Sequence, residues 1–191
     1  MRRIILFPLA ALAVLAALSP GAAEITSAER QAGLKVIRFL DKIETDALLK
    51  KKAMPGRMDF TEDEFNAYIA CRIDAEKDPV MKELKLKLFD RNRIEGKIFI
   101  DLRGHKIPAV LKSTMNLYFE GVFATDRDRI RLDFHKLYLD GQRIPILVLD
   151  VIIYVAAKLG KADAGSIHDW YDLPPGVKDL KTTAGGVSVY F

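Results

Sequence analysis

The strongest constraint on the fold is a change in the spacing of apolar residues near Met81. Before this residue the apolar positions recur every three or four residues, and from Leu84 to Leu139 they largely alternate with polar ones. Alternation predicts β-strands with one buried face, and short polar turns at residues 90–92 and 125–128 separate the runs. We therefore expect an α+β protein built on an antiparallel meander of four strands.

The predicted strands place large apolar residues on one face of the sheet. The pattern changes parity between Phe134 and Leu137, and a β-bulge near His135 and Lys136 would restore the common face. Seven residues are expected on the inner side of the sheet: Ile98, Ile100, Met115, Leu117, Phe119, Ile130 and Leu132.

Helical spacing predicts two helices before the sheet. The first spans residues 25–49, and the second begins at Thr61, where Thr61 and Glu64 match a capping box. A linker over residues 53–58 separates them, because it contains Pro and Gly. After the sheet, a turn at residues 173–176 leads into a closing hairpin over residues 177–191.

A third helix is expected over residues 144–157, the most apolar stretch of the chain after its first 23 residues. Its Val and Ile residues leave a buried strand open as an alternative. A helix that is apolar nearly all round is enclosed by protein or in contact with lipid. Its only charge, Asp150, is expected to cap a backbone group, pair with a cation or mark the mouth of a cavity. The residues expected to face the sheet are Leu147, Val151, Ile152 and Val155.

Residues 1–23 have the pattern of a secretory signal peptide. Arg2 and Arg3 precede an apolar run over residues 4–18, and small residues end the segment at Ala23. As a helix this run would span roughly 22 Å, which is short of the ~30 Å bilayer core needed by a permanent anchor. We therefore expect export to the periplasm with cleavage near Ala23.

Composition and residue spacing favour neither nucleic-acid binding nor catalysis. The net charge is +4 and would fall to +2 without Arg2 and Arg3, too little for a nucleic-acid surface. None of the three histidines has another His or a Cys at ligand spacing. Asp133 and His135 resemble half of an acid–base pair but have no nucleophile placed beside them. The single cysteine, Cys71, is expected to be buried. We predict no metal, no cofactor and no enzymatic activity, with a hydrolase that has a dispersed site as a minor alternative.

Two short motifs resemble those of a known group of envelope proteins. Residues 61–69 read T-E-D-E-F-N-A-Y-I, and residues 173–177 read L-P-P-G-V. In their order, with a meander, an apolar helix and a final hairpin, the chain resembles the LmeA-like and YceB-like exported phospholipid-binding proteins. These are related to the tubular lipid-binding superfamily, which includes the bactericidal/permeability-increasing protein. The resemblance covers residues 60–191 and implies a curved antiparallel sheet wrapped around a long apolar helix, with lipid between them.

The function expected from this resemblance is to bind or shuttle lipid or another long apolar ligand. Residues 24–56 would form an N-terminal helical segment and residues 57–191 the lipid-binding-like domain. The ligand would lie in a groove between the seven sheet residues and the four helix residues named above, with peripheral contact between the protein and a membrane. The alternative is an envelope assembly or interaction module without a ligand, which would present a sheet edge to a partner.

Overall fold

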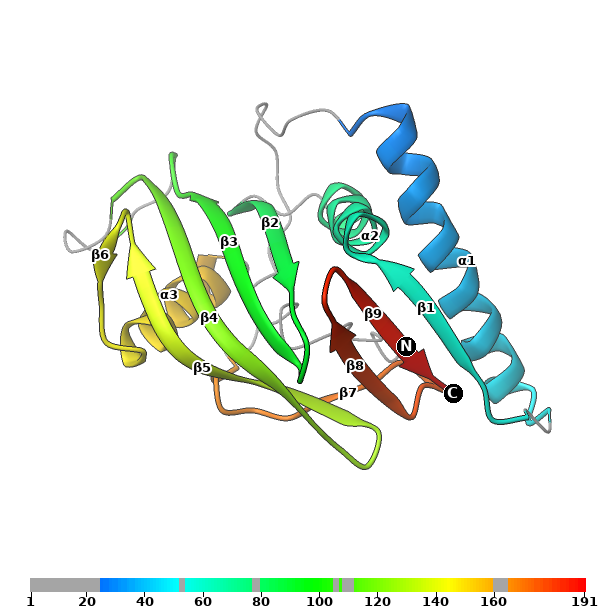
Figure 1. Ribbon diagram of the computed structural model, residues 1–191. Coiled ribbons are helices and arrows are strands. Elements are labelled where there is room, and N and C mark those ends of the chain that lie inside the picture. The colour runs from blue at the N-terminus through cyan, green and yellow to red at the C-terminus, as the bar shows by residue number, and fades with distance from the viewer. Residues whose placement is uncertain (1–24, 52–53, 77–79, 105–106, 108–111, 160–164) are drawn as a thin grey trace.

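A computed structural model describes residues 25–51, 54–76, 80–104, 107, 112–159 and 165–191. The predicted signal peptide lies outside the described residues. The described elements are three helices and nine strands (Figure 1): α1 (Ser27–Leu48), β1 (Arg57–Thr61), α2 (Glu62–Glu76), β2 (Met81–Leu88), β3 (Arg93–Asp101), β4 (Thr114–Asp126), β5 (Arg129–Leu139), β6 (Gln142–Arg143), α3 (Leu147–Leu159), β7 (Tyr171–Asp172), β8 (Asp179–Thr183) and β9 (Gly186–Tyr190).

The predicted meander forms the larger of two sheets. Its strand order is β2-β3-β4-β5-β6, all neighbours are antiparallel, and β7 pairs with β5. The sheet is strongly curled, and α3 lies behind it in Figure 1. The α+β class and the curved antiparallel sheet are confirmed. Residues 147–159 form a helix rather than a buried strand, and this helix begins three residues later than predicted, after Pro145.

The predicted β-bulge lies on β5. Lys136 pairs with Glu120 and Phe134 pairs with Gly121, so His135 is the extra residue between two pairs. The insertion restores the inner face, because Leu137 is fully buried although its parity differs from that of Phe134. The apolar residues on both sides of the bulge therefore belong to one continuous core.

A smaller three-stranded sheet has the order β1-β9-β8. The hairpin of β8 and β9 matches the prediction, but β1 occupies part of the segment expected to be a linker. Met58 and Phe60 alternate with polar residues, but the run is only five residues long, follows Pro55 and Gly56, and buries Phe60 alone. The strand exists because it pairs with β9, from Arg57 opposite Tyr190 to Thr61 opposite Gly186.

The helices α1 and α2 cover the smaller sheet and extend the same core. Val36 and Ile43 on α1 belong to the buried cluster that also contains the inner face of the large sheet. Gly33 allows close packing, because a Cβ there would lie 2.7 Å from both the Ala67 carbonyl oxygen and Cys71 Sγ. The burial predicted for Cys71 is confirmed.

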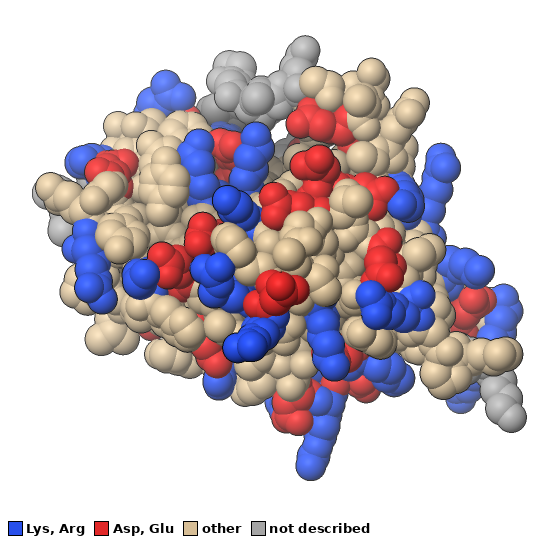
Figure 2. All heavy atoms as spheres, in the orientation of Figure 1, with Lys and Arg blue, Asp and Glu red and all other residues tan. Residues whose placement is uncertain are grey.

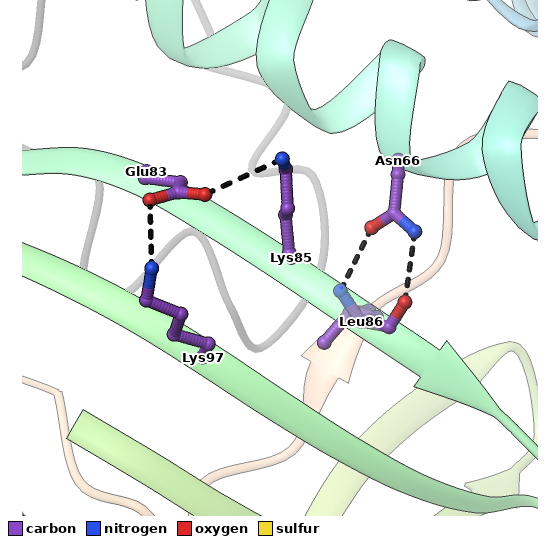
Figure 3. A network of polar contacts seen from close by, with 5 residues as sticks. All are labelled: Asn66, Glu83, Lys85, Leu86 and Lys97. Atoms are coloured by element: carbon purple, nitrogen blue, oxygen red, sulfur yellow. Dashed lines mark hydrogen bonds and ion pairs between the residues drawn. The ribbon is translucent and has the colours of Figure 1, made fainter. Parts of the chain in front are cut away.

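The start of α2 closes the outer edge of β2. The predicted capping box is present, since Glu64 N donates to Thr61 Oγ1 and Thr61 N donates to a Glu64 carboxylate oxygen. Asn66 donates to Leu86 O and accepts from Leu86 N, each at 2.8 Å (Figure 3). Glu62 accepts from Leu88 N at 2.7 Å. Side chains of α2 thus take the place of a neighbouring strand.

Candidate functional site

The inner face of the large sheet is the predicted wall of the ligand groove, and the structure buries all of it. The seven predicted sheet residues are each at most 2% exposed, and all belong to the hydrophobic core: Ile98, Ile100, Met115, Leu117, Phe119, Ile130 and Leu132. Their inward orientation is therefore confirmed. Whether they contact a ligand stays a prediction.

The four helix residues expected to face this wall do not lie on one side of α3. Ile152 is 2% exposed and Val155 packs partly against the core, whereas Leu147 and Val151 are 68% and 48% exposed. The expected inward orientation of Leu147 and Val151 is wrong. The inner stripe instead consists of Leu149, Ile152, Ile153 and Ala157, which recur at the three- and four-residue spacing of a helix. Because α3 is apolar all round, spacing alone does not show which stripe turns inward.

Apolar side chains remain exposed on the opposite face of α3. Leu147, Val151 and Tyr154, which is 52% exposed, follow one another at i, i+4 and i+7 and so share one line along the helix. We call these three residues the outer stripe. The sequence shows that these three residues share one side of the helix. It does not show whether that side faces the core or the solvent.

The inner face is filled by the protein's own side chains near its middle. The ring of Phe119 covers Gly96, where a Cβ would lie 2.1 Å from Cζ of that ring. A small cavity of about 10 Å³ lies elsewhere, between α1 and the smaller sheet, lined by residues such as Val36, Phe60 and Val189. That volume holds one water molecule at most. Neither this cavity nor the space over Gly96 has room for an acyl chain.

A wider depression lies beside the start of α3. Its volume is about 460 Å³, and its lining combines three basic side chains with apolar ones: His135, Lys136, Leu137, Arg143, Ile144, Pro145 and Ile146. The Lys136 ammonium contacts a Glu120 carboxylate oxygen at 2.9 Å, and this hydrogen bond raises the pKa of Lys136. Within the described part of the chain, no carboxylate forms an ion pair with Arg143. The depression therefore presents positive charge.

Asp150 connects α3 to the segment that follows it. Its Oδ1 accepts hydrogen bonds from Ile167 N at 2.9 Å and from Ser166 Oγ at 3.2 Å. Of the three roles considered for this carboxylate, the structure shows the capping of a backbone group. Nearby, Tyr171 donates to the Ser166 carbonyl at 3.3 Å, and burial, with added repulsion from Asp169 and Asp150, raises the pKa of Tyr171 to about 12.

The groups considered for acid–base or metal chemistry are engaged or dispersed. Asp133 accepts from the Arg131 guanidinium at 2.7 and 3.2 Å, while His135 is exposed at the bulge and His105 lies outside the described residues. Burial raises the pKa of the Cys71 thiol, which disfavours the reactive thiolate. Among the residues the structure places, no three His, Cys, Asp or Glu side chains gather closely enough to hold a metal ion.

The outer face of the large sheet is polar and carries positive and negative side chains in a mixed arrangement. Figure 2 shows Lys and Arg interspersed with Asp and Glu over this side of the molecule. Several of these side chains form ion pairs within 3.5 Å: Lys85 and Lys97 with Glu83, Arg93 with Glu95, Lys136 with Glu120 and Arg131 with Asp133. No helix within the described ranges is long and apolar enough to cross a bilayer. Comparison with protein-family models and with curated proteins gave no match.

Proposed function

We propose that the protein is an exported envelope protein that binds lipid or another long apolar ligand between its curled sheet and α3. The observation that carries this proposal is that α3 is apolar on two opposite faces. Leu149 and Ile152 are buried against the core, while Leu147 and Val151 are exposed on the other side. A helix that only completes a core needs one apolar stripe, because water meets its other face.

In this proposal the inner stripe of α3 contacts the ligand, and the outer stripe does not. When α3 moves away from the sheet, its inner stripe and the sheet wall can both contact an acyl chain. Each buried CH₂ of that chain contributes ~0.8 kcal/mol. Burial of a long acyl chain therefore offsets the free energy lost when helix and sheet separate, after the entropy cost of ordering the chain is deducted. In the bound state the sheet wraps around α3 and the ligand together, which is the arrangement implied by the resemblance to LmeA-like and YceB-like proteins.

The proposed activity is binding rather than catalysis. Asp133 and Cys71 are the side chains best suited to catalysis. Asp133 is bound by Arg131 and Cys71 is buried, so neither is placed to react with a substrate. The ligand would contact apolar side chains of the wall, and this site needs neither a metal nor a cofactor.

A second function, interaction with other envelope proteins without a ligand, is favoured by one observation. Phe119 already fills the space over Gly96, so the core is complete in that region without a lipid. Addition of a partner strand at β2 is disfavoured, because Asn66 and Glu62 occupy backbone groups of its outer edge. In this case the outer stripe of α3 would be the contact surface.

Native mass spectrometry of the protein purified from its own envelope separates the two functions. We expect a mass increment equal to one lipid, and uptake of a fluorescent fatty-acyl probe after the lipid is extracted. Phe119→Leu should increase probe uptake because it opens space over Gly96. Phe65→Leu is the matched control, since Phe65 is a buried ring on α2 beside the small cavity. A folded protein that carries no lipid and takes up no probe would support the interaction module instead.

A further inference from the structure

We infer that the outer stripe of α3 docks the protein on an anionic bilayer surface. Leu147, Val151 and Tyr154 are 68%, 48% and 52% exposed, so three large side chains on one line of a helix face solvent. These positions lie within one narrow sector of the helix. An exposed apolar line of this kind marks a contact surface more strongly than scattered single residues do.

Cations lie at both ends of this stripe. Lys158 continues the same line four residues after Tyr154, and its Nζ lies 5.3 Å from the centre of the Tyr154 ring. Near the other end Arg143 lines the depression together with residues 144–146, which directly precede Leu147 in the chain. Neither cation forms an ion pair with a described carboxylate. The acid on the helix, Asp150, is occupied by Ser166 and Ile167.

The charge pattern distinguishes this surface from the outer face of the sheet. There, cations such as Lys97 and Arg93 each have a carboxylate within 3.3 Å, so the surface attracts neither sign strongly. The apolar line of α3 is instead flanked by cations that have no carboxylate partner among the described residues. Helices that lie in the membrane interface have this combination, with apolar residues in the acyl boundary and Lys or Arg at the phosphates. Tyr154 suits the boundary between acyl chains and headgroups, because its ring is apolar and its hydroxyl is polar.

The dimensions fit a helix lying flat on a membrane. From Leu147 to Lys158 the helix advances by eleven residue steps, or roughly 16 Å. Three apolar side chains and two cations give weak, reversible binding rather than permanent anchoring. Docking goes beyond the binding of an interior ligand, and the two are measured separately, by vesicle binding and by acyl-probe uptake in vesicle-free solution.

The test is co-sedimentation of the protein, purified after export, with vesicles of phosphatidylglycerol and phosphatidylcholine mixed equally. We expect binding to these vesicles, weak binding to pure phosphatidylcholine and release by high salt. Leu147→Ser combined with Val151→Ser should lower vesicle affinity at least tenfold, with an unchanged melting temperature because both residues are exposed. Neutralising Arg143 or Lys158 to Gln should weaken binding about fivefold each and reduce the preference for the anionic lipid.

A second exposed apolar pair provides the matched control. Leu48 and Leu49 at the end of α1 are 69% and 62% exposed and precede Lys50, so they offer a similar composition elsewhere on the surface. Leu48→Ser with Leu49→Ser should leave vesicle binding unchanged. Three results would overturn the assignment of this face. Vesicle affinity could fall equally in both double variants, it could fall in the control alone, or the unmodified protein could fail to bind anionic vesicles.

Discussion

Gly96 on β3 lies directly beneath the ring of Phe119, its cross-strand partner on β4. A Cβ built on Gly96 would lie 2.1 Å from Cζ of that ring. The ring also packs edge-on against Phe134, with the ring centres 5.3 Å apart. A residue without a side chain therefore makes room for an aromatic one, and Phe119 fills the middle of the sheet wall.

Replacement of Gly96 by Ala should destabilise the protein by about 1 to 3 kcal/mol, because the added methyl overpacks a closed core. Urea unfolding measures the change. The penalty should be clearly smaller in a Phe119→Leu background, since the shorter side chain leaves space for the methyl. Equal penalties in the two backgrounds would show that the ring does not constrain this glycine.

Asn66→Ala should cost about 1 to 3 kcal/mol of unfolding free energy, because Leu86 loses both hydrogen bonds supplied by the Asn66 amide. The freed edge of β2 should also make the variant associate at high concentration, as measured by light scattering. Lys85→Ala is a suitable control on the same strand. Its ion pair with Glu83 is exposed, so its loss should change stability by less than about 1 kcal/mol.

Asp150→Ala should destabilise the protein by about 1 to 3 kcal/mol, because the buried Ile167 N–H loses its acceptor. Asp150→Asn should retain part of this stability, since its amide oxygen can still accept from Ile167. Amide hydrogen exchange reports the site directly, and Ile167 should exchange faster in the Ala variant than in the Asn variant. Unchanged exchange at Ile167 in both variants would contradict the capping role.

Local patterns predict most of the fold because the geometry of a strand or helix fixes which of its residues share a buried face. Alternation identifies the four long strands, and the parity change places the bulge at His135. Strand β1 escapes prediction because its five residues are held by pairing with β9, a contact that spans most of the chain. Asn66 lies in the motif of residues 61–69, but its role at the edge of β2 is not predicted, since its partner Leu86 lies in another element.

The inward orientation of the candidate residues is predicted correctly on the sheet and only partly on the helix. In a strand, period two fixes the face of every residue once one is known to be buried, so the wall from Ile98 to Leu132 follows. In α3 apolar residues surround most of the helix, and its two charged residues, Asp150 and Lys158, are too few to mark the inner stripe. Which side turns inward is decided by packing against the sheet, and the exposure of Leu147 and Val151 is visible in the structure alone.

Cys71 should react with a thiol reagent much more slowly in the native protein than in denaturant, because its side chain is buried on α2. Burial raises the pKa of its thiol above the ordinary value of 9.0, so the native rate should rise at higher pH than the unfolded rate. Because the unfolded thiol ionises first, the fold should lose stability as pH rises above about 9 towards the folded pKa, and this shift has no effect on stability at lower pH. Equal rates and equal pH profiles in the two states would refute burial.

A carboxylate should have different effects on the two faces of α3. Val151→Asp should fold with nearly unchanged stability, because Val151 is 48% exposed and the new charge stays hydrated. Ile152→Asp should destabilise the protein by several kcal/mol, because Ile152 is 2% exposed and its neighbours are apolar. Urea unfolding of the two variants gives this difference.

The same pair of variants separates docking from ligand binding. Val151→Asp should abolish binding to anionic vesicles, since it places a negative charge within the outer stripe, yet leave acyl-probe uptake intact. If the helix faces were reversed in solution, Val151→Asp would unfold the protein and Ile152→Asp would not. Loss of probe uptake in a folded Val151→Asp variant would instead place the ligand on the outer stripe, because only the exposed face of α3 has then been altered.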